Sequence, residues 1–335
     1  MENLSLLDAI EPKAMDAIAE RADAIADGDK PSDLVRAAMA LGSVPIMLGA
    51  LATTASAQAV TPTVIDVLNF ALLLENLESE FYKAVLGTSS VAAFNNAFAT
   101  VRAALPGANA TIIPTLQLLS AHEKAHVAFL TTTLNTLQAG SAKTYDPAST
   151  FDFTGGRGAG NGPFATATQD PTFLLAATQG FEDTGVRAYK GQAGKLLGTI
   201  ALKPALQIHA LEARHASRIR RLRRTLDTAN TQVRYSGTVK GDGAAAAGAP
   251  TGASLPGAVV TAFGLIYAGE GNTKHTVNNG SADVTIDASA LAGLASGTDV
   301  TLAFDEPLTA GQVAAIVQPF IVQDVTSLIA TSNLA

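Results

Sequence analysis

The chain has 335 residues, of which 47% are hydrophobic and only 15% are charged, so it is long enough for two domains, or for one domain with extensions, around a sizeable core. A formal net charge of −7 and a sequence pI of about 5.2 argue against a nucleic-acid-binding protein. Because the sequence contains no cysteine, disulfides, thiolate zinc sites, iron–sulfur clusters and cysteine nucleophiles are excluded, and any metal must be held by His and carboxylates.

Residues 1–60 are predicted to form an N-terminal helical, signal-like extension. Its apolar stretch, residues 37–51, is short for a membrane span, and it is followed by Ala55-Ser56-Ala57, a small-x-small pattern like a signal-peptidase site. The segment before it is long and net negative, which is atypical of a signal peptide. An export signal, an ordered packing helix and a membrane anchor stay open as interpretations. We favour export, to the periplasm or cell surface, over a cytoplasmic location.

From Thr61 onward, apolar residues recur at helical spacing and predict a helical bundle over residues 61–228. Thr61 or Thr63 is the expected N-cap of the first long helix and Gly87 its stop, while Asp170 and Pro171 are expected to begin the third. Residues 89–105 are predicted to form one short helix, and residues 141–170, rich in Gly, Thr, Asp and Pro, a long crossover loop. The four predicted long helices cover residues 61–87, 113–140, 170–191 and 202–224.

Residues 229–335 are predicted to form a small β-rich C-terminal appendage. It contains a low-complexity linker at 241–257 and one helix, 309–322, that breaks at Pro319. Four segments have the composition or the alternation that is typical of strands. These are residues 234–241, 258–269, 281–289 and 298–305.

The four long helices form two similar pairs. In each pair the first helix carries Glu-x6-Tyr-Lys and the second carries Glu-x-x-His. Residues i and i+3 lie on one helix face, so each Glu-x-x-His directs two ligand atoms to one point, and the lone Glu of the partner helix lies across the bundle axis. Two metals sharing six ligands is the arrangement of di-iron and di-manganese carboxylate bundles. The predicted ligands are Glu75, Glu123, His126, Glu182, Glu212 and His215.

The apolar surroundings of these residues favour metal over solvent as their partner. An unpaired buried carboxylate costs several kcal/mol, so buried Glu side chains need cations or protons. A metal-free Glu/His network is the alternative. Carboxylates with imidazole suit iron or manganese, so the expected cofactors are two iron ions, or alternatively manganese or mixed Fe/Mn.

The segments VLNFALLLENLESEFY, AHEKAHVAFL, GFEDTGVRAY and ALEARHASRI resemble the ferritin-like domain family, and more narrowly its bacterial and desiccation-related branch. The resemblance covers residues 61–226. It implies an all-α ferritin-like four-helix bundle with a long crossover between the second and third helices. It also implies a di-iron or related site on the same six residues, none of which departs from the pattern. The branch has no settled reaction, so the resemblance names no substrate.

Two further groups of residues have matched positions in the repeat. Glu78 lies one turn after Glu75 and is predicted as a seventh, redox-dependent ligand, or else as an acid outside the ligand set; its counterpart is Gly185. Tyr82 and Tyr189 are the candidate catalytic residues, which bond ligand carboxylates or shuttle electrons; the alternative is simple packing.

Two other histidines, His122 and His209, lie near the Glu-x-x-His motifs but off the predicted ligand face. We expect them to support the ligands from outside or to lie at the surface.

Three functions are consistent with these patterns. The first is a ferroxidase-like redox enzyme that uses dioxygen or peroxide to oxidise Fe(II), or that removes peroxide. The second is a structural or stress-protective surface protein that uses the bundle as a scaffold, with metal structural or absent. The third is iron storage in a closed cage, which the N- and C-terminal extensions disfavour. The expected partners are therefore metal ions and dioxygen or peroxide, with no nucleic acid, in a homo-oligomer for which a dimer is favoured over a cage.

Overall fold

The computed structural model describes residues 61–226, 257–278, 282–290 and 304–334, all of which belong to one compact unit, Ala55–Ala335. The predictions for residues 1–60, for the strand at 234–241, for nearly all of the linker and for most of the strand at 298–305 lie outside the described residues. Among the described helices, none combines the length and the apolar character that a membrane crossing requires.

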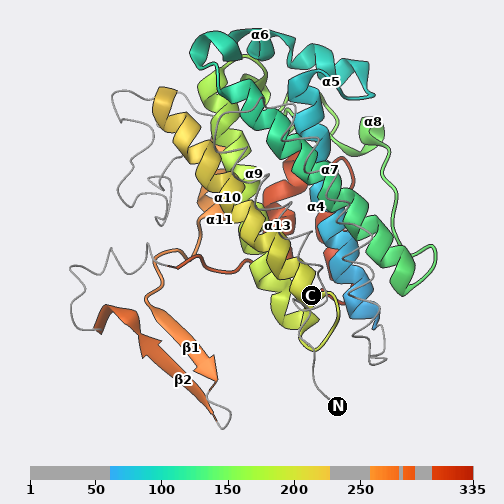
Figure 1. Ribbon diagram of the computed structural model, residues 1–335, viewed down its shortest axis with the longest axis vertical. Helices are drawn as coiled ribbons and strands as arrows, with labels where there is room; N and C mark the ends of the chain where they lie inside the picture. The colour runs from blue at the N-terminus through green and yellow to red at the C-terminus, as the bar shows by residue number, and fades with distance from the viewer. Residues whose placement is uncertain (1–60, 227–256, 279–281, 291–303, 335) are drawn as a thin grey trace, which may run out of the picture. The chain divides into compact units, whose positions relative to one another are not determined.

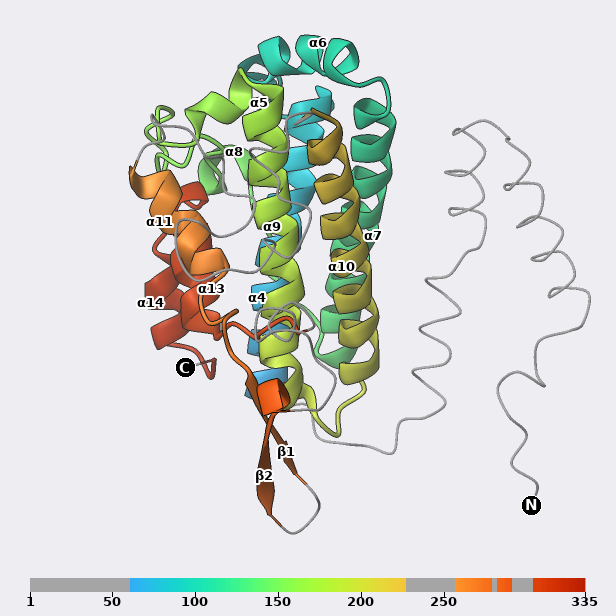
Figure 2. The ribbon, with the colours of Figure 1, turned by 90° about the vertical axis from the view of Figure 1, so that its left-hand side faces the viewer.

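Four long helices lie side by side and form the centre of the fold (Figures 1 and 2). Helix α4 packs chiefly against α7, and α9 packs chiefly against α10. Figure 2 shows that α4 and α10 run in one direction and that α7 and α9 run in the other. This confirms the predicted all-α four-helix bundle with a long crossover. The bounds are α4 Pro62–Leu86, α7 Ile112–Leu137, α9 Pro171–Gln192 and α10 Leu202–Leu226.

Capping residues mark both ends of α4 and the start of α9. The Thr61 side chain accepts a hydrogen bond from the backbone N–H of Val64, and Gly87 ends α4 in the left-handed conformation with φ 77°. The Asp170 carboxylate accepts from the N–H of Phe173 at 2.6 Å and starts α9. Sequence-local chemistry therefore sets both ends of α4 and the start of α9.

The connection between α4 and α7 consists of two short helices rather than the one predicted, α5 (Ala92–Ala97) and α6 (Ala99–Ala108). The chain turns at Phe98, whose ring is buried against Phe81 and Phe153, so burial of this side chain interrupts the helix. The crossover between α7 and α9 contains only the short α8 (Pro147–Thr150) and η1 (Ala165–Thr168).

The crossover loop is bonded to the C-terminal part of the chain. The N–H of Asp152 donates to the carbonyl of Phe320 at 2.9 Å, and the N–H of Val322 donates to the carbonyl of Thr150 at 2.9 Å. Within the loop, the Asp152 carboxylate accepts from the Thr154 hydroxyl and from the backbone N–H groups of Gly160 and Gly158, which lowers its pKa despite partial desolvation. The long loop is thus held in one conformation by its own acid and by distant backbone.

The described C-terminal region is mainly helical and includes a two-stranded sheet. Strands β1 (Lys274–Asn278) and β2 (Asp283–Asp287) pair antiparallel, with Lys274 opposite Asp287. The strand predicted within 281–289 is confirmed as β2, and the helix predicted from residue 309 is confirmed as α13 (Ala310–Val317), followed by the η4 turn at Pro319. Helix α14 (Val325–Ala330) and the η3 turn (Ala288–Ala290) complete this region.

The strand predicted at 258–269 is wrong, because these residues form helix α11 (Gly257–Ile266). A continuous apolar run fits a buried helix as well as a strand, and here packing decides. Helices α11 and α13 both pack against α9, in which every residue from Phe173 to Ala188 is buried. A Cβ at Gly180 would come within 3.1 Å of Ile266, so this glycine permits the close approach of α11.

A polar network lies between α9, α10 and the segment after α11. The Asp183 carboxylate accepts hydrogen bonds from the Tyr267 hydroxyl at 2.6 Å and from Arg220 at 2.8 Å. Arg187 forms an ion pair with Glu270 at 3.1 Å and donates to the carbonyl of Ala268 at 2.6 Å. Buried charges need such partners. The C-terminal layer, which consists of α11, the segment after it and α13, therefore supplies partners for buried charges of the bundle, and the bundle supplies partners for those of the layer.

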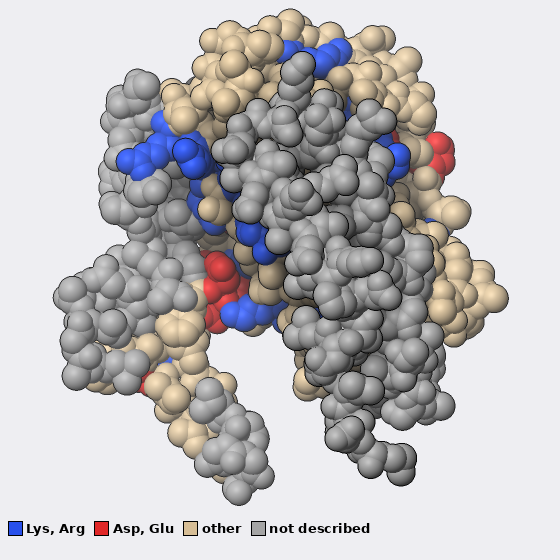
Figure 3. Space-filling model, in the orientation of Figure 1, with Lys and Arg blue, Asp and Glu red and all other residues tan. Residues whose placement is uncertain are grey.

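The end of α10 is basic at the surface. Figure 3 shows Lys and Arg side chains gathered there, at the upper left. The exposed members, Arg218, Arg221 and Arg224, are spaced by three residues and so share one face, where their charge complements the helix dipole.

Candidate metal centre

The six predicted ligands, one or two from each long helix, meet inside the bundle. Their ligand atoms form two groups, and within each group all lie within 4.8 Å of one another. Glu123 and Glu212 belong to both groups and so lie between two positions at which an ion fits. The first group is Glu75, Glu123, His126 and Glu212, and the second is Glu123, Glu182, Glu212 and His215.

The first group surrounds Nδ1 of His126. This nitrogen lies 3.1 Å from Oε2 of Glu75, 3.0 Å from Oε2 of Glu123 and 3.3 Å from Oε1 of Glu212. The three acids come from α4, α7 and α10, so the group joins three helices.

The second group surrounds Nδ1 of His215 in a similar way. Here the distances are 3.0 Å to Oε1 of Glu123, 3.1 Å to Oε2 of Glu182 and 3.8 Å to Oε2 of Glu212. Two ligand atoms that bind one ion at right angles, each about 2.1 Å from it, are themselves about 3 Å apart, so most of the separations suit a shared ion.

The charge of the cluster also suits divalent cations. All four carboxylates are at most 2% exposed, and His126 and His215 are 7% and 3% exposed. Four carboxylates with two neutral imidazoles carry a charge of −4, which two divalent ions balance. Without cations this charge would have to be neutralised by protons, because isolated buried carboxylates are unstable.

Three buried oxygens of the shared acids accept no hydrogen bond from the described residues. They are Oε1 of Glu123 and both carboxylate oxygens of Glu212. Oε1 of Glu123 and Oε1 of Glu212 lie 3.0 Å and 3.3 Å from a histidine Nδ1, but each of these nitrogens is also within 3.1 Å of another carboxylate oxygen. A ring nitrogen carries at most one proton, so two histidines cannot satisfy this many oxygens. Carboxylate oxygens that bind a metal ion need no hydrogen-bond donor, so unpaired oxygens at the shared position fit metal ions.

The pKa values show how the acids compensate without cations. Burial raises the pKa of Glu123 to about 7, and burial together with the charge of Glu123 raises that of Glu212 well above its ordinary value. Burial also opposes ionisation of Glu75, but the charge and hydrogen bond of His126 lower its pKa. The shared acids therefore favour protons, while Glu75 favours the ionised form.

The two histidines behave oppositely to ordinary buried imidazoles. Burial alone would lower their pKa values, but the charges of Glu75 and Glu182, with hydrogen bonds to the acids, raise the pKa of His126 to about 10 and that of His215 to about 9. The cluster without ions is thus rich in protons, which an ion has to displace.

The two tyrosines cross between the repeats. The hydroxyl of Tyr82 on α4 donates to Oε1 of Glu182 on α9, and that of Tyr189 on α9 donates to Oε1 of Glu75 on α4, the latter at 2.5 Å. Both tyrosines therefore contact the lone acids. This is the first of the two predicted roles, a bond to a ligand carboxylate. Burial raises both phenol pKa values well above 10, so both remain protonated donors.

The remaining candidates lie around the cluster. Glu78 is buried at 6% exposure, and burial with the nearby charge of Glu182 raises its pKa, but it belongs to neither of the two ligand groups. A Cβ at Gly185 would come within 3.1 Å of Oε2 of Glu212, so the glycine leaves space beside that acid.

The two outer histidines differ. Nδ1 of His122 lies 2.9 Å from Nε2 of His215 with the rings stacked, so His122 supports His215 from the side away from the acids. His209 bonds the carbonyl of Val186 and lies outside both ligand groups. The contact of His122 with His215 joins α7 to α10, and no local sequence pattern predicts it.

Comparison with known proteins agrees with this geometry. The family model of the ferritin-like domain matches residues 63–225. No curated protein and no solved structure matches the chain.

Proposed function

The chain belongs, over residues 63–225, to the ferritin-like domain family, and we propose that its buried Glu/His cluster holds two iron ions for ferroxidase-like redox chemistry. Manganese, or one iron with one manganese, is the alternative pair. The observation that carries the proposal is that Glu123 and Glu212 are shared by both ligand groups and yet have oxygens without hydrogen-bond donors. The proposed ligands are Glu75, Glu123, His126, Glu182, Glu212 and His215.

When bound, such a pair supplies two electrons to dioxygen or peroxide. The chain's own side chains provide the rest. His126 and His215 each anchor one position, and the crossed hydroxyls of Tyr82 and Tyr189 fix the orientation of the lone acids. The near-complete burial of the acids keeps bulk water away from the reacting centre.

Gly185 supports a role in which Glu212 moves. Because Gly185 has no side chain, there is space beside Oε2 of Glu212 that a Cβ would fill. An acid with this freedom can rearrange as the charge of its partners changes. Glu78, which matches Gly185 in the repeat, is the proposed additional ligand for one of the two charge states.

Anaerobic titration of the full chain with Fe(II) tests the proposal. We expect about two ions per chain in the unaltered protein. Glu123→Ala and His215→Ala are expected to lose bound iron, while the exposed Arg218→Ala keeps it. If the unaltered protein, reconstituted without air, retains no iron, the proposed function is wrong.

The second candidate is a structural or stress-protective protein with structural or no metal. The bonding of the crossover loop to the C-terminal region and the enclosed cluster favour it, because both suit stability rather than turnover. Bound iron that reacts with neither dioxygen nor peroxide would select this candidate.

Assembly and location belong to the same proposal. We favour a dimer over an iron-storage cage, because the chain extends well beyond the bundle at both ends. Sedimentation of the purified protein distinguishes a small oligomer from a shell. Export remains a proposal based on residues 37–57, and cell fractionation checks it.

A further inference from the structure

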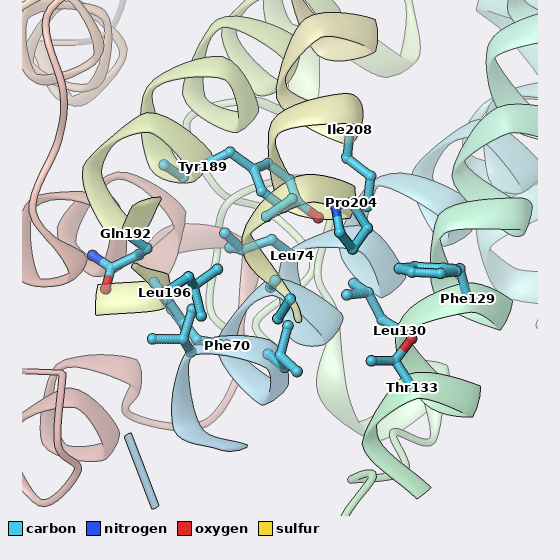
Figure 4. A pocket seen from close by; sticks show the side chains of 16 residues that line it. Phe70, Leu74, Phe129, Leu130, Thr133, Tyr189, Gln192, Leu196, Pro204 and Ile208 are labelled. Atoms are coloured by element: carbon cyan, nitrogen blue, oxygen red, sulfur yellow. The ribbon is translucent and has the colours of Figure 1, made fainter. Parts of the chain in front are cut away.

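An apolar pocket with about 30 Å³ of space, partly open to the outside, lies between all four long helices. Figure 4 shows its side chains converging from α4, α7, α9 and α10, with carbon atoms facing the space almost throughout. The polar side chains among the labelled residues are Tyr189, Gln192 and Thr133.

The cavity lies one helical turn from the Glu/His cluster. On α4, Ala71 lines the cavity four residues before Glu75, and on α10, Ile208 lines it four residues before Glu212. Residues four apart share a helix face and are separated by about one turn of 5.4 Å.

The other two helices run the opposite way, and their lining residues accordingly follow the cluster. On α7, Leu130 comes four residues after His126. On α9, Tyr189 lines the cavity while its hydroxyl donates to Glu75 at 2.5 Å, so one side chain touches both spaces. The four helices therefore place the cavity directly beside the cluster, along the bundle interior.

Size and lining together select the occupant. One water needs about 10–15 Å³ of such space, so the cavity holds a molecule of two or three atoms. Apolar walls offer water no hydrogen-bond partner and favour apolar guests such as xenon. Hydrogen peroxide would lose its hydrogen bonds to water on entering, whereas dioxygen has none to lose.

Two polar atoms in the lining make no hydrogen bond to the described residues, Oγ1 of Thr133 and Oε1 of Gln192. Both residues lie farther along their helices from the cluster, Thr133 a turn beyond Phe129 and Gln192 almost a turn beyond Tyr189. Any water that these atoms attract is held at the far end. The end beside the cluster keeps its apolar walls.

We propose that this cavity is a dioxygen-binding chamber that serves the cluster, and that dioxygen rather than peroxide is the oxidant. The inference rests on the proposed function. In the simplest balanced reaction, two Fe(II) ions each lose one electron, and dioxygen takes up these two electrons and two protons to leave as hydrogen peroxide.

The first test uses xenon and the metal-free full chain. We expect xenon to bind in this cavity, seen by 129Xe NMR and in xenon-pressurised crystals. Ala205→Leu, which fills the cavity from α10, should abolish that binding. Ala210→Leu is the matched control, because Ala210 is exposed on the same helix. Ala71→Leu fills the cavity from α4 and replaces Ala205→Leu if that variant does not fold.

The second test compares oxidants in the iron-loaded protein. The filled variant should oxidise Fe(II) several-fold more slowly with dioxygen at low concentration and at an unchanged rate with peroxide. Absence of xenon from the cavity, or equal effects on the two oxidants, overturns the inference. Its failure leaves iron binding intact, whereas failure of the proposed function appears as loss of iron binding in the unaltered protein.

Discussion

The carboxylates of the cluster differ in what stabilises each of them. Glu75 is paired with His126 and Tyr189 and prefers to be ionised, while Glu212 lies at the shared position and prefers a proton. The two acids are equally buried, at 2% and 1% exposure, so the difference comes from their partners and not from burial alone.

Replacing each of these acids with its neutral isostere should therefore change stability in opposite directions. Glu212→Gln should raise the free energy of unfolding of the metal-free protein and abolish iron binding at both positions, because Glu212 belongs to both groups. Glu75→Gln is the matched comparison: it should lower metal-free stability and affect one position only. Urea unfolding and anaerobic Fe(II) titration measure the two effects, and equal iron loss in both variants would contradict the division into two groups.

The metal-free protein should become less stable as pH rises from about 5 to 10. The pKa of Glu123 rises from 4.5 to about 7 on folding, and those of His126 and His215 rise from 6.5 to about 10 and about 9. His122 opposes this below about pH 6.5, because burial lowers its pKa to about 4, but the raised pKa values of Glu212 and Glu78 add to the effect. The folded chain thus binds more protons than the unfolded chain across this window, and stability falls wherever that holds. The contribution of His126 and His215 is complete below pH 6.5 and is lost as pH passes through 9 to 10.

Bound ions should weaken this dependence, because they replace the protons. Thermal unfolding at a series of pH values, with a chelator and with added metal, tests the sign. A metal-free melting temperature that increases between pH 6 and 9 would show that the acids are not held in this protonated state.

At this scale the sequence revealed the acids and histidines of the cluster because the Glu-x-x-His spacing is local to one helix. A bond from Tyr82 to a ligand carboxylate was predicted, but not that the carboxylate is Glu182. The stacking of His122 on His215 and the apolar pocket were not predicted either. Each depends on distances between helices, which no local pattern encodes.

Among the elements, the bundle helices were predictable to within a few residues from their apolar periodicity, and capping residues mark both ends of α4 and the start of α9. Helix α11 was not, since its residues are apolar on every side and its conformation follows from packing against α9. Where a local hydrogen bond sets the boundary, sequence is sufficient; where burial sets the conformation, it is not.

The cap of α9 offers a test at this scale. Asp170→Ala removes the carboxylate that accepts from the N–H of Phe173, and should lower the free energy of unfolding by about 1 kcal/mol without changing iron stoichiometry. Asp146→Ala is the control, because Asp146 precedes α8 and caps no helix N–H. Equal destabilisation by both changes in urea unfolding would mean that the cap does not set the start of α9.

For the molecule as a whole, the C-terminal layer decides how α9 is buried. Helices α11 and α13 cover it. Arg187 and Asp183 on α9 form hydrogen bonds with residues of the segment that follows α11. A helix that is enclosed on all sides needs partners beyond the bundle, so the C-terminal residues contribute to the same core.

At Gly191, α9 and the C-terminal layer approach each other most closely among the glycines of α9. A Cβ there would lie 1.8 Å from the carbonyl oxygen of Leu308, whose own N–H donates to the carbonyl of Arg187 at 3.1 Å. Gly191→Ala must push the backbone near Leu308 away from α9 and should lower the free energy of unfolding by about 1–3 kcal/mol, despite the better helix propensity of Ala.

Gly194→Ala is the matched control, because nothing lies within 4 Å of the Cβ that it adds. Hydrogen exchange should quicken in residues 304–317 of Gly191→Ala and stay unchanged in Gly194→Ala, with iron stoichiometry the same in both. If the two substitutions have the same effect on hydrogen exchange and on the free energy of unfolding, the C-terminal layer does not contribute to the stability of α9. The bundle core is then stable without that layer.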